Sequence, residues 1–552
     1  MESDSEHRVK SDTGESRSWS WTRMFLCSLL LLWGVSYGLL NLGDVFESEL
    51  GGHPDEASHY VTGLMVHDYV WGHLGENPLA YAELYYEFYP KVAIGHFPPG
   101  FYVIQSLWFS LFSDSLNSVL LLQSFVAGVL GAMIACLVTW GGGRRGLSIL
   151  VGLVFCSLPL VQRYVGMVMS DLLLGLFCFG ASWCFGIFLQ KPGYRWSLLF
   201  GFLAAGTIMI KGSGLMLAFV PPIALVLTRR YELFRSREFW AATLPVLAIC
   251  LPWMLLTYKI TEEGMVREWS PGYVAEALPY FAKQIYRTLG AGLCILMVIG
   301  VRASLKGRQA AGKVPEMSAV MLALPIGLIL TYTLIPVGFE QRYLIPFIGP
   351  AMFFVGMGCC WVWNKSVLSE QAQWKGIPVL LCFLGLYLIE VFSVPAKGFQ
   401  GFQNLVDAMD LNHDGVSKKI LVSSDARGEG AVVASVAMSD VRLGNRVLRG
   451  SKVLSSSDWM GRGYTLAHTN STDLLAFFKT EEIDWLIVDL SVPMDRSMGH
   501  HGQVARLVQD FPMEFERAGQ STILRRFKGS QNLASVYRVR PHQRNARNGE
   551  SE

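Results

Sequence analysis

About eleven long apolar runs in the sequence limit the possible fold more than any other feature. A transmembrane helix needs roughly 20 apolar residues to cross a hydrocarbon core about 30 Å thick. Only 16% of the residues are charged, whereas soluble domains have roughly 25%. We therefore predict an all-α polytopic membrane protein with a C-terminal soluble α/β domain. The predicted spans are residues 24–43, 116–140, 147–162, 168–189, 196–210, 213–228, 238–258, 287–302, 317–336, 342–363 and 376–394.

The short connections between these runs predict the orientation of the chain. Every second connection is basic, as at Arg144 with Arg145 and at Arg229 with Arg230, and Lys and Arg gather on the cytoplasmic side of membrane proteins. The N-terminus is therefore expected in the cytoplasm and the segment after residue 395 outside it. The first run is followed by NLGDVF rather than a small-residue cleavage site, which predicts an uncleaved anchor.

The polar segments complete the predicted domain organisation. The aromatic run 98–112 is short and is expected to lie at the outer interface. The C-terminal part alternates strand-like runs (418–424, 484–491, 521–527, 534–540) with helix-like runs (430–438, 471–482, 501–511), which is typical of an α/β domain. The predicted parts are a cytoplasmic tail 1–23, a transmembrane domain 24–395 with outer loops 44–115 and 259–286, an α/β domain 396–540 and a disordered tail 541–552.

Composition excludes several classes of function. A net charge of +2 gives no support for a nucleic-acid partner. All ten cysteines fall inside apolar runs, so a disulfide framework and a CxxC zinc site are not expected. We assign no cofactor and no metal, although His53, Asp55 and Glu56 could together hold a divalent ion.

Two acids in the first outer loop are the densest candidate for chemistry. Asp55 and Glu56 follow Pro54 about ten residues after the first span. Adjacent acids on a helix point in different directions, so one can act as a general base while the other caps or pairs. A proline before two acids is also an ordinary helix start, and both interpretations stay open at this point.

Other candidate residues lie at the outer ends of spans. His96 and Lys91 stand near the paired prolines of GHFPPG, at the depth of a lipid phosphate, or the segment only forms a turn. Asp171 opens a span and is either functional or part of a helix cap. Lys211 and Arg342 could hold an anion, or each could extend to the interface as a single cation.

The order of these motifs resembles the C-type glycosyltransferase superfamily. The segments are PDEASHY, PPGFYVIQSLWFSLF, MSDLLLGLF, the IMIKGSG pair of helices and QRYLIPF, and together they extend over residues 24–363. Within the superfamily, the chain looks most like the protein O-mannosyltransferase and aminoarabinose-transferase branch.

This resemblance implies a glycosyltransferase that transfers a sugar, with inversion, from a polyprenyl-phosphate carrier to an acceptor on the non-cytoplasmic side. It implies Asp55 as the catalytic acid, which takes the proton of the acceptor hydroxyl or orients the acceptor, and Asp171 as a second acid that shapes the same cavity. Glu56 is a third catalytic candidate because it stands beside Asp55. Donor contacts are expected from Lys91, His96, Lys211, Arg342 and Tyr343.

The expected partners are the lipid-linked sugar donor, membrane lipid and an acceptor that the sequence does not identify. The expected location is a bacterial plasma membrane, with the active site on the periplasmic or extracellular side. Two alternatives remain: a transporter or lipid-linked-sugar flippase, and a membrane scaffold for a C-terminal binding module. The outer loop 259–286 could close over a cavity or be a solvated amphipathic stretch.

Overall fold

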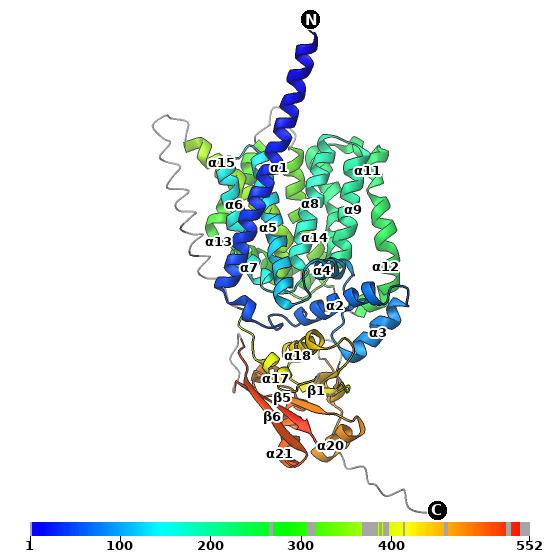
Figure 1. The fold of residues 1–552 in the computed structure, drawn as a ribbon. Helices are drawn as coiled ribbons and strands as arrows, with labels where there is room; N and C mark the ends of the chain where they lie inside the picture. The colour runs from blue at the N-terminus through cyan, green and yellow to red at the C-terminus, as the bar shows by residue number, and fades with distance from the viewer. Residues whose placement is uncertain are drawn as a thin grey trace, which may run out of the picture. The chain divides into compact units, whose positions relative to one another are not determined.

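The computed structural model describes residues 3–263, 269–306, 315–366, 385, 389, 397–411, 415–457, 462–525 and 532–540. The chain forms two compact units (Figure 1). Unit 1 comprises residues 1–43, 95–101 and 120–395, and unit 2 comprises residues 44–94, 102–119 and 396–552. The predicted outer loop 44–115 therefore folds mostly in the same unit as the C-terminal segment, a grouping that the sequence analysis did not anticipate.

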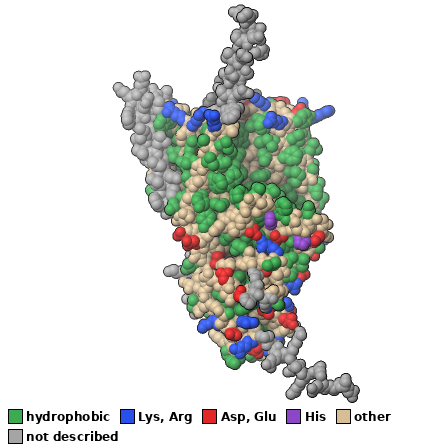
Figure 2. All heavy atoms as spheres, viewed as in Figure 1, with side chains coloured by type: hydrophobic (Ala, Val, Ile, Leu, Met, Phe, Trp, Pro, Cys, Tyr) green, Lys and Arg blue, Asp and Glu red, His purple; other side chains and the backbone are tan. Residues whose placement is uncertain are grey.

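Unit 1 is a bundle of helices whose sides are covered by hydrophobic side chains, with Lys and Arg gathered at one end of the bundle (Figure 2). Its elements are α1 Ser3–Leu42, most of α5 Leu116–Trp140, α6 Arg145–Ser157, α7 Pro159–Val165, α8 Asp171–Gln190, α9 Tyr194–Ile210, the 3-10 helix η2 Gly212–Phe219, α10 Val220–Thr228, η3 Tyr231–Arg235, α11 Arg237–Ala241, α12 Thr243–Glu263, α13 Pro271–Lys306, α14 Glu316–Leu334, η5 Gln341–Leu344 and α15 Ile345–Ser366.

Seven helices in the described part of the chain are long and apolar enough to cross a membrane. The predicted span 147–162 corresponds to α6 and α7, which bend by 62° at the break before Pro159, where a proline cannot continue a helical hydrogen-bond ladder. The predicted spans 196–210 and 213–228 are shorter apolar helices. The predicted span 376–394 lies outside the described residues, apart from isolated positions.

The predicted outer loop 259–286 is largely helical in the structure. Helix α12 continues to Glu263, and α13 begins at Pro271 and is interrupted only by the non-helical backbone of Gly290. The buried residues Tyr273, Ala277 and Phe281 recur every four positions, which is the spacing of one helix face. This part of the chain is therefore an amphipathic helix that continues into a span.

Unit 2 contains a five-stranded sheet in the order β2-β1-β5-β7-β6, in which β2, β1 and β5 are parallel and the other pairings are antiparallel. One face of the sheet packs on α17 and α18, and the other on α20 and α21. The elements are η1 Val45–Glu47, α2 Glu56–Gly72, α3 Pro78–Phe88, α4 Gly100–Leu111 except its first two residues, α17 Phe402–Asp407, β1 Lys419–Ser423, α18 Ala426–Ser439, β2 Arg446–Arg449, α19 Gly450–Val453, β3 Ser455–Ser456, β4 Thr465–Leu466, α20 Ser471–Thr480, β5 Trp485–Asp489, η7 Met494–Arg496, α21 Gly499–Asp510, β6 Phe515–Thr522 and β7 Leu533–Val539.

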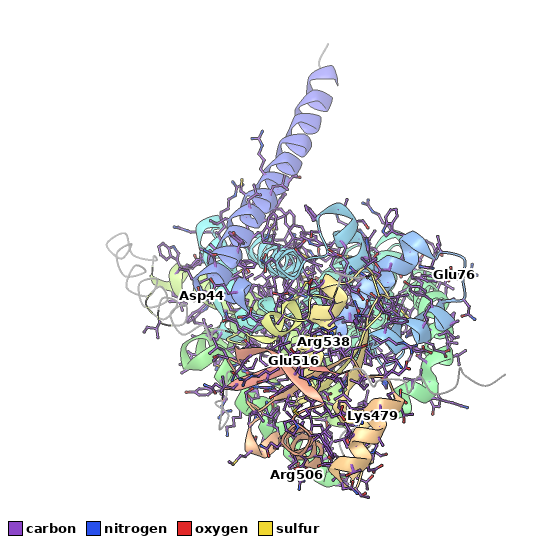
Figure 3. All side chains as sticks on the ribbon, turned by 60° about the horizontal axis from the view of Figure 1, so that its bottom comes forward. Asp44, Glu76, Lys479, Arg506, Glu516 and Arg538 are labelled. Carbon is purple, nitrogen blue, oxygen red and sulfur yellow. The ribbon has the colours of Figure 1, made fainter. Side chains whose placement is uncertain are left out.

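The structure confirms the predicted C-terminal α/β domain and corrects one strand. The run 521–527 was predicted as a strand, but β6 ends at Thr522 and begins at Phe515. β6 is an edge strand that pairs only with β7, and Glu516 lies opposite Arg538 across this pairing (Figure 3). An edge strand with one solvated face carries many polar residues, so FERAGQST has no apolar run that would mark it as a strand.

Candidate functional site

Asp55 lies at the start of α2, in a position where its side chain remains accessible. It is the N-cap residue of the helix, and its side chain is 33% exposed. Its backbone N–H donates to His53 Nδ1 over 3.1 Å, and its Oδ2 lies 3.5 Å from the same nitrogen. The structure thus provides an accessible carboxylate beside an imidazole, which is a suitable setting for a general base.

Glu56, the next residue, has a different environment. It is fully buried; its Oε1 accepts a hydrogen bond from Lys397 Nζ at 2.5 Å, and its Oε2 accepts one from the Gly52 N–H at 2.8 Å. Both carboxylate oxygens of this buried side chain are thus used by partners, one by an ammonium group and one by a backbone N–H. The two adjacent acids therefore have separate environments, and Glu56 acts as an anchor of α2 in the structure.

Lys91 lies in the same unit and is also buried. Its Nζ donates to the carbonyl oxygens of Pro54, over 3.3 Å, and of Ala426, over 3.1 Å. Burial, and to a smaller extent the nearby Arg449, lowers the pKa of Lys91 to about 7, even though Glu429 and Asp55 oppose the shift. The lysine is therefore attached to the turn that carries Asp55.

A second group of predicted residues lies together in unit 1. Lys211 Nζ donates to Asp171 Oδ1 over 2.6 Å, and Asp171 is 1% exposed. Arg342 Nε lies 2.8 Å from Glu340 Oε2. Lys211 and Arg342 both face the ring of Tyr343, at 5.3 and 5.6 Å from its centroid. Two cations, each paired with a carboxylate, thus converge on one aromatic ring inside the helical unit.

The local sequence explains how this buried cluster forms. Lys211 stands at the break between α9 and η2, where the helix ends after Ile210. A Cβ on Gly214 would lie 2.7 Å from the backbone of Thr207, so this position accepts only glycine without a backbone shift. The break places the Lys211 side chain inside the bundle rather than along a helix surface.

Tyr332 supports the ring of Tyr343. The two rings stack with centroids 4.8 Å apart and an angle of 19° between their planes. Tyr332 was not identified from the sequence, and neither were Glu340 and Lys397. Each is a single polar residue near a span, and no local motif distinguishes it from an ordinary interfacial residue.

His96 is exposed and has no hydrogen-bonding partner among the described residues. It belongs to unit 1, through the short segment 95–101. Its predicted phosphate contact therefore stays a prediction. Within the described residues, no three His, Cys, Asp or Glu side chains gather as a metal site would require.

Unit 2 also contains a cavity of about 400 Å³, lined partly by Glu49, Gln403, Asn404 and Ser435. The Glu49 carboxylate accepts hydrogen bonds from the N–H groups of three successive residues, Gly401, Phe402 and Gln403. Burial raises the pKa of Glu49, and these backbone hydrogen bonds oppose the shift. None of the residues predicted from the sequence lines this cavity.

Comparisons with known proteins add independent information. Residues 96–256 match the family model described as dolichyl-phosphate-mannose-protein mannosyltransferase. A search of curated proteins finds no relative by sequence. Among solved structures, the chain is similar to ArnT from Cupriavidus metallidurans in the apo state, with a TM-score of 0.56 and 13% identity over 95% of this chain and 98% of that chain.

Two further similar structures contain a lipid phosphate. ArnT from Cupriavidus metallidurans bound to undecaprenyl phosphate has a TM-score of 0.54 and 12% identity, over 94% of this chain and 98% of that chain. The oligosaccharyltransferase AglB from Archaeoglobus fulgidus, in complex with an inhibitory peptide and a dolichol-phosphate, has a TM-score of 0.53 and 12% identity, over 84% of this chain and 69% of that chain. At these low sequence identities, the similarity shows a shared fold and nothing more specific.

Proposed function

We propose that this integral-membrane glycosyltransferase of the C-type superfamily transfers a sugar from a polyprenyl-phosphate carrier to an acceptor on the non-cytoplasmic face of the membrane. The superfamily resemblance expected from the sequence is confirmed by the family match and by the fold. The donor class, the acceptor and the residue roles are the proposed part.

The observation that carries the proposal is the convergence of Lys211 and Arg342 on Tyr343. A charged residue inside an apolar helical unit is costly and usually has a function. Each of the two cations is paired with a carboxylate, Lys211 with Asp171 and Arg342 with Glu340. Because the Glu340 side chain is 35% exposed, Arg342 can exchange this partner for a phosphate at a lower desolvation cost than Lys211 can.

The chemistry of the donor fits such a cluster. A sugar on a polyprenyl phosphate is a phosphodiester with one negative charge. When the bond between the sugar carbon and the phosphate oxygen breaks, the electron pair stays on the phosphate, which then carries a second charge. Two fixed cations stabilise that added charge more than they stabilise the bound donor, and this difference lowers the barrier.

Asp55 is the base in this proposal, which is the role that the superfamily resemblance implies for it. Its accessible carboxylate removes the proton of the acceptor hydroxyl while the acceptor oxygen attacks the sugar carbon. A single displacement of this kind inverts the configuration at that carbon. Asp171 then positions Lys211, and Glu56 anchors α2. Support for the donor class comes from the lipid phosphates bound to ArnT and AglB.

The test is a transfer assay with the purified full-length protein in lipid nanodiscs. Radiolabelled monosaccharides on undecaprenyl and dolichyl phosphate are offered together with membrane lipids and proteins as acceptors. Asp55→Asn should abolish transfer without lowering the thermal unfolding midpoint. The matched control is Asp44→Asn, an exposed acid at the start of the same unit that makes no side-chain cap. Wild-type protein that transfers sugar from none of these donors would contradict the proposal.

A further inference from the structure

The segment that leads into the C-terminal domain lies beside the residues that precede Asp55 in the sequence. The Glu49 N–H donates to the Phe399 carbonyl oxygen over 2.7 Å. A Cβ on Gly51 would lie 2.1 Å from the Phe399 ring, so the ring fills the space that any other residue at position 51 would need. Residues 397–403, which we call the strap, therefore pack directly against residues 49–56.

The strap is also attached to the sheet of the C-terminal domain. The Arg525 guanidinium, which follows β6, lies 5.4 Å from the ring centroid of Phe399 and 5.8 Å from that of Phe402. Arg525 in turn binds Asp425 over 2.9 Å and also binds Asp489, so it connects the strap to the ends of β1 and β5. A displacement of the strap would consequently disturb these buried ion pairs.

Both ends of α2 are held by residues of the C-terminal segment. At its start, the buried Glu56 pairs with Lys397 of the strap. Near its end, Asp68 Oδ2 accepts a hydrogen bond from Arg442 Nε over 3.0 Å, and Arg442 also donates to Asp114 over 2.6 Å. Since Asp55 is the N-cap of this helix, its position depends on both attachments.

The residue before Asp55 is held as well. Lys91 donates to the Pro54 carbonyl oxygen and to the Ala426 carbonyl oxygen at the start of α18. Helix α18 approaches α2 closely at Gly430, where a Cβ would lie 3.0 Å from the Ala57 side chain. Pro54 and Glu56, the two neighbours of Asp55, are thus each held by a buried lysine.

We propose that the C-terminal α/β domain positions the catalytic carboxylate, and that Lys397 is a positioning residue for Asp55 through its ion pair with Glu56. This inference rests on the proposed function, because Asp55 is the base in that proposal. It assigns the C-terminal domain a supporting role, whereas the alternative named from the sequence was a binding module. The geometry of the strap favours the support.

The test compares three variants of the full-length protein. Lys397→Met breaks the ion pair, Lys397→Arg retains a cation, and Glu56→Gln with Lys397→Met removes the pair without burying a lone charge. Lys479→Met is the matched control. Lys479 lies on α20 (Figure 3), away from the strap, and its Nζ pairs with Glu514 Oε1 over 3.1 Å. Steady-state transfer kinetics and hydrogen–deuterium exchange of peptides covering residues 50–60 are measured for each protein.

A positioning role predicts that Lys397→Met lowers kcat by about 10- to 100-fold, because a small displacement of a reacting group has effects of this size. The KM for the donor should change by less than about twofold, since the donor contacts remain. Exchange at residues 50–60 should rise in this variant and stay at the wild-type level in Lys397→Arg and in Lys479→Met.

The neutral double variant keeps the inference testable if Lys397→Met does not fold. In a folded Glu56→Gln, Lys397→Met protein, a lower kcat and faster exchange at residues 50–60 support positioning. Wild-type kcat and wild-type exchange in that folded protein overturn it. If the wild type transfers no sugar from any donor, the proposed function fails, whereas the exchange measurement still decides whether the strap fixes the segment around Asp55.

Discussion

Lys211 Nζ and Asp171 Oδ1 form a 2.6 Å ion pair inside the helical unit, between the break after α9 and the first residue of α8. The pair is nearly inaccessible to solvent. Breaking a buried pair by removing one partner leaves an uncompensated charge, which costs more than the pair itself contributes.

Asp171→Asn should therefore lower the stability of the protein by about 3–5 kcal/mol. The double variant Asp171→Asn, Lys211→Met should regain most of this loss, because no lone charge stays buried. The thermal unfolding midpoint in detergent, measured for wild type and both variants, checks this. An Asp171→Asn protein as stable as the wild type would show that Lys211 does not depend on this partner.

The glycines that follow Lys211 offer a matched pair of substitutions. Gly214→Ala should destabilise the protein by about 1–3 kcal/mol, since the added methyl group meets the rigid backbone of Thr207. Gly212→Ala should have little effect, because no atom lies within 4 Å of its would-be Cβ. Comparing the unfolding midpoints of the two variants distinguishes the destabilisation due to the close contact from the general effect of replacing a glycine. Equal losses would argue against the contact.

The Tyr343 ring allows the proposed donor site to be probed without altering a charge. Tyr343→Leu removes the aromatic face that Lys211 and Arg342 approach. It should raise the KM for the donor roughly 2- to 30-fold, in line with the size of cation–π interactions. Tyr343→Phe keeps the ring and should stay close to wild type. Similar values for Leu and Phe would exclude the ring from donor binding.

Lys91 should make stability depend on pH. Burial lowers its pKa in the folded protein to about 7, below the usual value of 10.5, so the unfolded chain holds this proton more tightly between these values. The contribution of Lys91 to stability should therefore rise as the pH increases from about 7 to about 10, and be lost as the pH falls toward 7.

The measurement is the unfolding midpoint of wild type minus that of Lys91→Met at pH 7, 8, 9 and 10. The same difference for Lys479→Met serves as the background. A Lys91 difference that stays constant, or that falls with rising pH, would contradict the assigned burial of the ammonium group.

Much of the fold could be predicted from the sequence because its signals are local. Apolar runs of membrane length marked the spans, and β1, β5 and β7 could be recognised by their apolar residues. β6 was placed too late in the sequence, since an edge strand needs no continuous apolar run. The helical part of α13 before Gly290 was assigned to a loop because its charged residues concealed the buried face.

The sequence was sufficient to predict which residues form the candidate site, but not which residues pair with one another. Asp171, Lys211, Arg342 and Tyr343 were all named from the sequence, and they lie together. Their partners were not predicted, because a contact such as Glu56 with Lys397 joins residues 341 positions apart. No spacing rule applies over that distance, and a single lysine in VPAKGF carries no signal of its own.

Unit 2 is assembled from separate stretches of the chain, and this arrangement has a consequence for biogenesis. Residues 44–94 emerge early from the ribosome, whereas the strap and the sheet emerge only after the last predicted span. Until then Glu56 lacks Lys397 and Asp68 lacks Arg442. The segment around Asp55 therefore lacks these partners until the end of translation, and a chain cut short within the bundle would leave it without its framework.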